Sequence, residues 1–525
     1  MSAEGSGDDV VEDPRHGPPR PPRPSTGPGT GCGSGRPGHR PSRARRGGRI
    51  RDVLGRKPKV VVVGGGPGGY EAALVAAQLG AQVTVVERAG MGGSTVLTDV
   101  VPSKTLISVA EVMNQASEAE ALGLRFPGSD GDPETAEPIT VDLARVNARV
   151  RKLAEAQSAD IARRLDAEGV RVLRGSGRLD GTERVVAELA GGGSEVLDAD
   201  ITLVSTGSSP REMDSARPDG ERILTWKQLY QLESIPERLV VVGSGVTGAE
   251  FASAYDALGS DVVLVSSRDR VLPGQDGDAA EVIEDVFRRR GMELMGRSRA
   301  KAARREGDGV VVTLEDGREV RGSHCLMAVG SVPNTVGIGL EEAGVELSGS
   351  GHVQVDRVSR TSARGVYAAG DCTGVLPLAS VAAMQGRTAM WHALGDAVSP
   401  LRLRKVSANI FTAPEIATVG WTQEQVESGE VDGEVLMLPL AGNARAKMLG
   451  IRDGFVKLFA STGSGRVLGG VVCAPRASEL IFPVALAVEH GLTVDQVAHA
   501  FTVYPSLSGS VAEAARRLHA SPEIA

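Results

Sequence analysis

A Gly-x-Gly-x-x-Gly motif occurs twice in this 525-residue chain, and each copy lies directly between an apolar strand and a helix. The first copy, residues 64–69, follows the apolar run at 59–63 and precedes an Ala-rich stretch that predicts a helix over 70–79. The second copy, residues 243–248, follows the apolar run at 239–242. A further apolar strand comes after each predicted helix. This order is that of a dinucleotide-binding unit, so we expect an α/β fold with two nucleotide sites.

The glycines and the acid of such a unit have separate roles. Gly64 forms the tight turn, Gly66 lets the backbone approach a pyrophosphate, and Gly69 allows the helix to pack on the strand. Glu87 ends the second strand, where it is placed to hydrogen-bond an adenosine ribose. The predicted nucleotide-binding residues of the two motifs are Gly64, Gly66, Pro67, Gly68 and Gly69 in the first unit and Gly243, Gly245, Val246, Thr247 and Gly248 in the second.

Four further segments, at 204–208, 328–334, 365–371 and 378–379, carry sequences typical of one family. Through them and both glycine motifs, the chain resembles the flavin-dependent disulfide reductases, the group that includes dihydrolipoamide dehydrogenase. The resemblance implies two Rossmann-like dinucleotide-binding domains, for FAD and then for NADH or NADPH, and an α+β C-terminal dimerisation domain. It also implies cofactor contacts by Thr206, Gly207, Gly330, Asp371, which holds the flavin ribityl chain, and Ala379, whose backbone meets the isoalloxazine ring.

The segment at 92–104 lacks the two residues that perform this family's disulfide chemistry. In disulfide reductases, two cysteines in this segment form the redox disulfide that passes electrons from flavin to substrate. The corresponding positions in this chain are Thr95 and Val100. Neither a hydroxyl nor an isopropyl group can cycle between thiol and disulfide, so we expect no dithiol exchange.

Lys104, at the end of the same segment, matches a family lysine that pairs with a glutamate beside the flavin N5 atom. The matching glutamate is Glu250, near the start of the second nucleotide helix. A cation at that position stabilises the anionic reduced flavin, and this electrostatic role needs no thiol. The resemblance therefore makes Lys104 and Glu250 candidate catalytic residues, with Lys104 also in contact with the flavin.

The end of the second unit bears on the choice of nicotinamide cofactor. Family members that prefer NAD carry a glutamate at the position aligned with Ser266, where it binds the ribose hydroxyls and repels a 2′-phosphate. Here the acid is replaced by Ser266 and Ser267, with Arg268 next in the chain. Hydroxyls and a guanidinium can donate hydrogen bonds to a phosphate. These three candidate contacts favour NADPH, or tolerance of both cofactors.

The C-terminal third shows a second loss. Residues 411–420 resemble the opening of the family's dimerisation domain, which implies a homodimer. Disulfide reductases carry a His-Pro pair and a later glutamate in this domain, as the acid-base dyad for the dithiol. Aligned on Pro505, the two positions hold Tyr504 and Gly509, and nearby His499 is interpreted as structural. The histidine and glutamate serve to form the thiolate of the dithiol, so they have no task once the cysteines are gone. The loss of both cysteines together with this dyad therefore predicts that the electron acceptor has changed.

A quinone suits such a site, because it is flat and apolar and accepts two electrons. The chain is also similar to an actinobacterial subgroup of the family that acts as NAD(P)H:quinone reductases. We therefore expect an FAD-dependent NAD(P)H:quinone oxidoreductase, in which Tyr504 either donates to the developing quinol oxygen or only packs at the interface. Two alternatives are dihydrolipoamide dehydrogenase or transhydrogenase on the same scaffold, and a non-enzymatic flavin-binding redox sensor.

Composition limits the possible partners and location. The formal net charge of −8 gives no indication of nucleic-acid binding. No run of about 18 apolar residues would span a bilayer, so we expect no transmembrane segment. The isolated cysteines show no metal-ligand spacing and are typical of a cytoplasmic protein, and they are Cys32, Cys325, Cys372 and Cys473.

The motifs also predict the domain layout. A Pro-, Gly- and Arg-rich tail at 1–56 has no apolar period and is predicted to be disordered. The FAD-binding domain is predicted in two parts, at 57–210 and 334–398, with the NAD(P)-binding domain at 211–333 between them. The dimerisation domain is predicted at 403–525.

Overall fold

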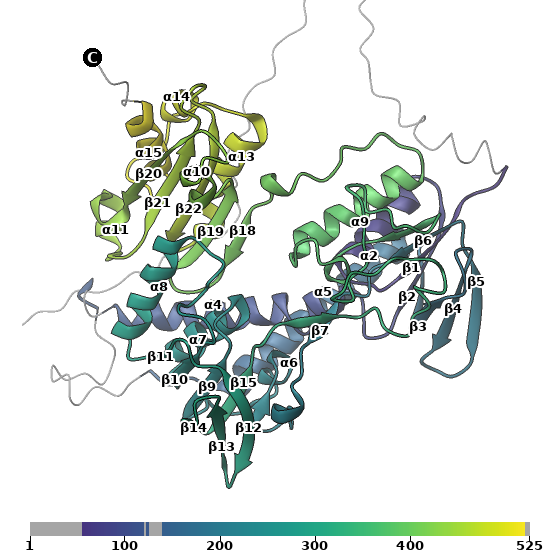
Figure 1. The fold of residues 1–525 in the computed structure, drawn as a ribbon, viewed down its shortest axis with the longest axis horizontal. Helices are drawn as coiled ribbons and strands as arrows, with labels where there is room; N and C mark the ends of the chain where they lie inside the picture. The colour runs from purple at the N-terminus through teal and green to yellow at the C-terminus, as the bar shows by residue number, and fades with distance from the viewer. Residues whose placement is uncertain (1–54, 120–121, 125–138, 520–525) are drawn as a thin grey trace, which may run out of the picture. The chain divides into compact units, whose positions relative to one another are not determined.

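The computed structural model describes residues 55–119, 122–124 and 139–519. Nearly all of the tail predicted to be disordered therefore lies outside the described residues. The described chain is a mixed α/β protein with two sheets of mainly parallel strands, of seven and five strands, and an antiparallel C-terminal sheet of five strands (Figure 1). Two smaller antiparallel sheets have three and two strands. The predicted fold class is confirmed.

The first sheet contains the first glycine motif and has the strand order β17-β6-β1-β2-β3-β4-β5. Its first five strands are parallel, and β4 and β5 extend it as an antiparallel hairpin. Parallel strands covered on both faces need continuous apolar sequence, which explains the valine run of β1. The strands are β1 (Lys59–Val63), β2 (Gln82–Glu87), β3 (Arg171–Leu179), β4 (Arg184–Leu189), β5 (Ser194–Asp198), β6 (Ile201–Val204) and β17 (Val366–Ala368).

Helices α2 (Pro67–Gln78) and α9 (Ala379–Ala393) pack against each other and join the two sequence segments of this domain. Their approach is close, since a Cβ atom on Gly386 would lie 2.0 Å from the carbonyl oxygen of Gly68. Helix α2 begins at Pro67 rather than at the predicted Tyr70, because proline suits the first turn, where its missing N–H needs no partner. The other helices of this domain are α3 (Gly93–Leu97), α4 (Val100–Ser117) and α5 (Leu143–Ala167).

The second sheet is parallel and contains the second glycine motif, in the order β11-β10-β9-β15-β8. Its strands are β8 (Ile223–Leu224), β9 (Arg238–Val242), β10 (Asp261–Val265), β11 (Glu293–Met295) and β15 (His324–Met327), and its helices are α6 (Trp226–Leu229), α7 (Val246–Ala257) and α8 (Gly277–Arg289). A short antiparallel pair, β7 (Ser208–Pro210) with β16 (Ser331–Pro333), lies where the chain enters and leaves this unit.

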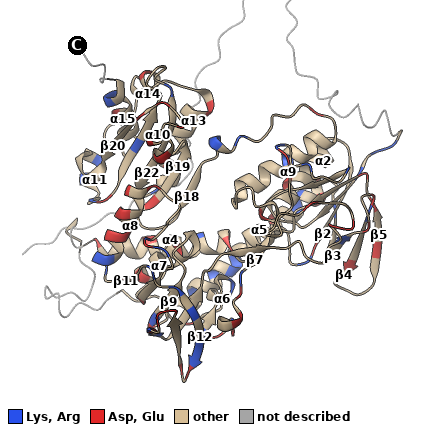
Figure 2. Cartoon of the chain, in the orientation of Figure 1, with Lys and Arg blue, Asp and Glu red and all other residues tan. Residues whose placement is uncertain are grey.

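A three-stranded antiparallel sheet, β12 (Ala300–Glu306), β13 (Gly309–Leu314) and β14 (Glu319–Gly322), follows β11 in the chain. Basic and acidic residues both occur on β12 and β14, whereas β13 has none (Figure 2). They pair across the sheet, with Arg304 3.0 Å from Glu319. Such exposed pairs contribute little to stability, at most about 1 kcal/mol each.

The C-terminal sheet is antiparallel, in the order β18-β19-β22-β21-β20. Its strands are β18 (Ala408–Ile410), β19 (Glu415–Gly420), β20 (Glu434–Pro439), β21 (Phe455–Ala460) and β22 (Val467–Ala474). The helices of this domain are α10 (Gln423–Glu427), α11 (Ala444–Met448), α12 (Ala477–Leu480), α13 (Phe482–His490), α14 (Val494–Ala498) and α15 (Gly509–His519). The 3₁₀ turns of the described chain are η2 (Asp214–Ala216), η3 (Asp371–Thr373), η4 (Leu403–Lys405) and η5 (Leu440–Gly442).

A buried lysine joins this sheet to helix α8 of the second nucleotide unit. Lys457 lies on β21 and its side chain is 1% exposed. Its ammonium group is 2.8 Å from both carboxylate oxygens of Asp276, which caps α8, and 2.5 Å from Asp278. The amide oxygen of Gln423 accepts a further hydrogen bond. This charge is therefore fully partnered, as burial of an ammonium group requires.

Candidate functional site

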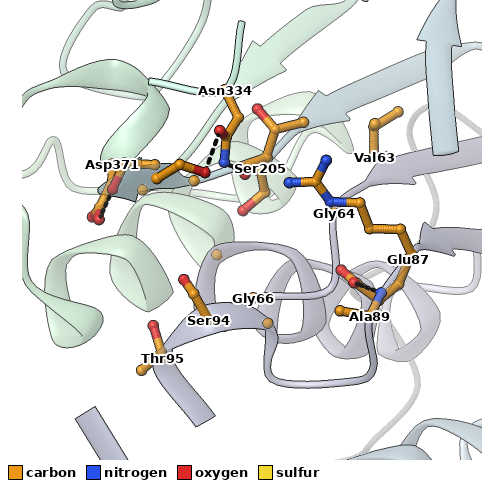
Figure 3. Close-up of a pocket in the computed structure, with 18 of the residues that line it drawn as sticks. Val63, Gly64, Gly66, Glu87, Ala89, Ser94, Thr95, Ser205, Asn334 and Asp371 are labelled. Carbon is orange, nitrogen blue, oxygen red and sulfur yellow. Dashed lines mark hydrogen bonds between the residues drawn. The ribbon is translucent and has the colours of Figure 1, made fainter. Parts of the chain in front are cut away.

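A cavity of about 460 Å³ lies at the carboxyl ends of β1, β2 and β6. Figure 3 shows Glu87 and Ala89 at one end of it, Gly64 and Gly66 in the middle, and Asp371 at the other end. The carboxyl edge of parallel strands is where open α/β sheets bind ligands. The predicted residues that line this cavity together are Gly64, Gly66, Pro67, Gly68, Glu87, Thr206, Gly207, Asp371 and Ala379.

The first glycine motif leaves room for a ligand where the sequence predicted it. Gly64 has a φ of 101°, in the left-handed region that glycine tolerates. A Cβ atom on Gly69 would lie 1.9 Å from the carbonyl oxygen of Gly64, so Gly69 is required for helix packing. By contrast, a Cβ atom on Gly66 would meet no protein atom within 4 Å. Gly66 thus faces open space, as a pyrophosphate position should.

Glu87 is held in place by the backbone around it. One carboxylate oxygen accepts a hydrogen bond of 2.6 Å from the Gly65 N–H, and the other accepts one of 2.6 Å from the Ala89 N–H. Each carboxylate oxygen can accept more than one hydrogen bond, so capacity remains for ribose hydroxyl groups. A carboxylate at this end of an elongated cavity fits the adenosine part of FAD.

At the other end of the cavity, the Asp371 carboxylate accepts a hydrogen bond of 2.9 Å from Ser208. Burial raises the pKa of Asp371 above its usual value, and the hydrogen bond from Ser208 opposes that rise. Asn334 lies nearby and donates to the Thr206 carbonyl oxygen at 2.9 Å. Ser208 and Asn334 were not predicted as site residues, although they end the family-typical segments at 204–208 and 328–334.

Lys104 and Glu250 lie side by side, 146 positions apart in sequence, with 2.7 Å between Nζ and Oε2. Glu250 is 5% exposed, and its second oxygen accepts a hydrogen bond of 2.9 Å from the Phe411 N–H. The ammonium group of Lys104 also lies 4.9 Å from the centre of the Phe411 ring. Helices of both nucleotide units and the start of the C-terminal domain therefore meet at this ion pair. Phe411 contacts Glu250 through its backbone N–H, and sequence alone does not indicate such a contact.

The second glycine motif repeats the geometry of the first. Gly243 has a φ of 112°, and a Cβ atom on Gly248 would lie 1.8 Å from its carbonyl oxygen. A Cβ atom on Gly245 would again meet nothing within 4 Å. Val246 and Thr247 form the first turn of α7, and Gly330, with a φ of 94°, follows β15. These features fit a second dinucleotide.

Strand register identifies Ser266 as the counterpart of Glu87. Val86 pairs with Val63 in the first unit, and Val265 pairs with Val242 in the second, so Glu87 and Ser266 are the residues that follow. Ser266 is buried, however, and its hydroxyl lies 2.6 Å from that of Ser244.

The neighbours of Ser266 are more accessible. Ser267 and Arg268 are exposed, and so is Arg297, whose backbone N–H donates to the Arg268 carbonyl oxygen at 2.6 Å. Arg297 was missed from sequence because the β10–β11 pairing brings it to this position from elsewhere in the chain. Of the predicted contacts to a 2′-phosphate, Ser267 and Arg268 are the ones with free access.

Within the described part of the chain, no thiol lies at the position of the missing disulfide. Thr95 lines the cavity, and Val100 begins α4. The three cysteines within the described residues are buried. Burial raises the pKa of Cys325 and Cys473 to about 12 and that of Cys372 to about 11, which suppresses the reactive thiolate.

The predicted counterpart of the family histidine, Tyr504, is 84% exposed and is not among the residues that line the cavity. Phe501 and Val503 beside it are also exposed. Gly509 begins α15, and His499 lies at the end of α14 with its ring nitrogen against the Asp495 carbonyl oxygen. An exposed cluster of Phe501, Val503 and Tyr504 is more typical of a subunit interface than of a solvent-facing surface.

The comparisons with known proteins agree with this arrangement. The family model described as pyridine nucleotide-disulphide oxidoreductase matches residues 58–386, and the model of its dimerisation domain matches residues 406–515. Within the described residues, no helix has the length and apolar character needed to cross a membrane.

Individual relatives extend the match over most of the chain. A protein of Mycobacterium tuberculosis named NAD(P)H dehydrogenase (quinone) is 53% identical over 475 residues, which is 89% of this chain and 95% of the relative. The dihydrolipoyl dehydrogenase of Haloferax volcanii is 34% identical over 464 residues, 87% of this chain and 95% of the relative. The crystal structure of LpdA from Mycobacterium tuberculosis covers 88% of this chain and 99% of its own, with a TM-score of 0.83 and 53% identity.

Members of this family are oxidoreductases that bind FAD and NAD(P)H, and the open space at Gly66 and at Gly245 fits these cofactors. The dimerisation domain supports a homodimer. The chain belongs to the pyridine nucleotide-disulphide oxidoreductase family.

Proposed function

We propose that this protein is an FAD-dependent NAD(P)H:quinone oxidoreductase that works without a redox disulfide. The observation that carries the proposal is Thr95 at the flavin cavity, in place of a redox cysteine, together with an intact Lys104–Glu250 pair. The name of the Mycobacterium tuberculosis relative supports a quinone as the acceptor. The dihydrolipoyl dehydrogenases of Haloferax volcanii and Bacillus subtilis are more distant, at 34% and 32% identity.

When bound, FAD supplies the two-electron chemistry between nicotinamide and acceptor. We propose that the protein's part is to supply a cation where negative charge develops, and that Lys104 is this cation. Glu250 fixes the direction of Lys104 through the 2.7 Å ion pair, and the Phe411 N–H in turn fixes Glu250. A preorganised charge of this kind needs no thiol and no rearrangement during the reaction.

Tyr504 completes this proposal at the interface of the homodimer. We propose that its phenolic O–H donates a hydrogen bond to the acceptor oxygen, at the place where disulfide reductases use a histidine. Its 84% exposure in one chain leaves the hydroxyl available to a site shared between two chains. The other interpretation, packing at the interface alone, predicts that Tyr504→Phe leaves quinone reduction unchanged.

NADPH is the proposed nicotinamide cofactor, with NADH accepted. The position of the usual repelling acid holds Ser266, whose hydroxyl is engaged by Ser244. Ser267, Arg268 and Arg297 are exposed beside it and would donate to a 2′-phosphate. We also propose a cytoplasmic location, on the isolated cysteines of the sequence.

Anaerobic absorption spectroscopy of the FAD-loaded protein tests this function. NADPH should bleach the oxidised-flavin band, and a small benzoquinone should restore it, whereas lipoamide should not. Lys104→Met should slow the bleaching, and Lys59→Met, which removes an exposed lysine from β1, should not. Recovery of the band with lipoamide would contradict the proposal, and absence of bleaching by either NADPH or NADH would favour a redox sensor.

A further inference from the structure

Lys227 lines the flavin cavity although it belongs to the other nucleotide unit. It lies on α6, which follows β8 of the second sheet, and it is one of the residues around the 460 Å³ cavity of the first unit. Helix α6 is well anchored, since Trp226 and Leu229 on either side are buried. At its start the Gln228 side chain accepts a hydrogen bond of 2.7 Å from the Thr225 N–H. The backbone that carries Lys227 is therefore firmly held.

The ammonium group of Lys227 has no ion-pair partner. Five lysines of the described chain are buried or half-buried, and four of them pair with a carboxylate. The four pairs are Lys59 with Asp198, Lys104 with Glu250, Lys405 with Glu489 and Lys457 with Asp276. Half-buried Lys227 is the fifth, and among the described residues no carboxylate lies within ion-pair distance of it. Because burial of an unpaired charge is costly, an anion beside Lys227 would be stabilising.

A second cation lines the same cavity. Arg88 follows Glu87 at the end of β2 and is exposed, and it too lacks a carboxylate partner within the described part of the chain. Burial and, next, repulsion by Arg88 lower the pKa of Lys227, and the more distant Asp99 and Glu212 oppose this shift. Two unpaired cations on one cavity form a site for an anionic group.

FAD contains one group of this kind. Its adenine, its sugar chains and its oxidised isoalloxazine ring are uncharged, and only its pyrophosphate is anionic. The open space at Gly66, at the start of α2, fits that pyrophosphate. An ammonium group is a compact charge with three hydrogen-bond donors, and lysine is a common phosphate ligand for this reason.

We propose that Lys227 binds the pyrophosphate of FAD, so that a residue of the second nucleotide unit holds the cofactor of the first. Lys227 is then a cofactor-binding residue that takes no part in electron transfer. This role depends on FAD alone and is the same for any electron acceptor. Lys227 lies outside both glycine motifs, and no sequence motif marks it.

Release of FAD from the full-length, FAD-loaded protein on dilution tests this role. The fluorescence of the released flavin gives the dissociation constant. Lys227→Met should raise that constant about tenfold at low salt, as expected for loss of one charge-assisted hydrogen bond. Lys227→Arg keeps the charge and should retain most of the affinity. Lys301→Met removes an exposed lysine of β12 that does not line the cavity, and it should leave the constant unchanged.

Salt dependence separates a phosphate contact from a structural role. Salt screens the attraction between an ammonium group and a phosphate, so the FAD affinity of the unaltered protein should fall between about 0.05 M and 0.5 M salt. The fall should be smaller in Lys227→Met, which lacks that attraction. A lower affinity with an unchanged salt dependence would contradict the proposal, because Lys227 would then support only the fold.

The midpoint potential of the bound flavin tests the other anion, which is the reduced ring. Contact of Lys227 with pyrophosphate predicts a similar potential in Lys227→Met and in the unaltered protein. A lower potential with an unchanged affinity for oxidised FAD would contradict the proposal and place Lys227 at the ring. An unchanged affinity and an unchanged potential would also contradict it. Failure to reduce a quinone would overturn only the proposed function, because FAD affinity is measured without an acceptor.

Discussion

The two nucleotide-binding units of this chain have the same backbone and different side chains at the ribose position. The first glycine of each motif has a positive φ, 101° at Gly64 and 112° at Gly243. A Cβ atom added to the last glycine would lie 1.9 Å from the first glycine's carbonyl oxygen in one unit and 1.8 Å in the other. At the end of the second strand, however, one unit has Glu87 and the other has Ser266. We therefore propose that glycine sterics allow a dinucleotide to bind in each unit, and that the side chain at the ribose position sets which dinucleotide is preferred.

The ribose position is also coupled to the middle of each motif. Gly65 leaves room for Glu87, since a Cβ atom on Gly65 would lie 3.0 Å from the Glu87 side chain, and its N–H binds the carboxylate. In the second unit the same position is Ser244, and its hydroxyl meets that of Ser266. Gly65 with Glu87 and Ser244 with Ser266 are thus two ways of filling the ribose position. If only one residue of a pair is replaced by its counterpart, we expect the new side chain to fit poorly.

The largest expected effect is that a substitution in one glycine motif abolishes binding of one cofactor and leaves binding of the other intact. Gly69→Ala should yield protein without FAD, because the added methyl group collides with Gly64. Gly248→Ala should retain FAD but show no bleaching by NADPH. Gly349→Ala serves as the control, since its Cβ atom would meet nothing within 4 Å. FAD content and anaerobic bleaching measure the two effects, and loss of both cofactors from either variant would contradict the independence of the units.

The second prediction concerns the contacts that stabilise each nucleotide-binding unit. The first packs through the apolar α2–α9 contact, whereas the second is joined to the C-terminal sheet by buried Lys457. Lys457→Met should lower the free energy of unfolding by about 3–5 kcal/mol, because it leaves Asp276 buried without its partner. Lys405→Met, which breaks a more exposed pair, should cost at most about 1 kcal/mol. Urea unfolding measures both changes in the free energy of unfolding. Equal losses in the two variants would show that the buried ion pair stabilises the protein no more than the exposed one.

A change of cofactor preference is the third and smaller effect. Ser244→Gly combined with Ser266→Glu gives the second unit the same two residues that the first unit has as Gly65 and Glu87. The ratio of kcat/KM for NADH to that for NADPH should rise about tenfold or more, since a carboxylate repels the 2′-phosphate. Ser266→Glu alone should give a smaller change, because the Ser244 side chain occupies the space. An unchanged ratio in the double variant would place cofactor choice elsewhere.

The smallest expected effect is that of thiol alkylation. Each nucleotide unit holds one buried cysteine, Cys372 in the first and Cys325 in the second, and burial raises both pKa values. Iodoacetamide applied to protein reduced by NADPH should therefore leave quinone turnover unchanged. A disulfide reductase would be inactivated under these conditions, because reduction exposes its thiolate. Inactivation here would mean that a cysteine takes part in the reaction.

Much of this arrangement could be predicted from sequence, because short motifs carry steric demands. The two glycine motifs are local patterns of that kind. The loss of both cysteines and the Lys104–Glu250 pair, whose members lie 146 positions apart, were instead predicted from the resemblance to the family. The sequence pattern places the start of α2 too late, because it assigns Pro67 to the loop. Proline is compatible with both a loop and the first helical position, so only the backbone separates the two.

Other features depend on contacts between distant segments and could not be predicted. The hydrogen bond from the Phe411 N–H to Glu250 involves the backbone, which has no sequence signal. The approach of Arg297 to Arg268 depends on strand pairing.

The central claim is that electrons pass through this protein without a redox disulfide, and anaerobic titration with dithionite tests it most directly. Dithionite delivers two electrons, and family members with a redox disulfide take up four electrons per subunit, two at the flavin and two at the disulfide. We predict that one equivalent of dithionite per FAD reduces this protein completely, with no new thiols formed. Uptake of a second equivalent, with two new thiols per subunit, would contradict the account.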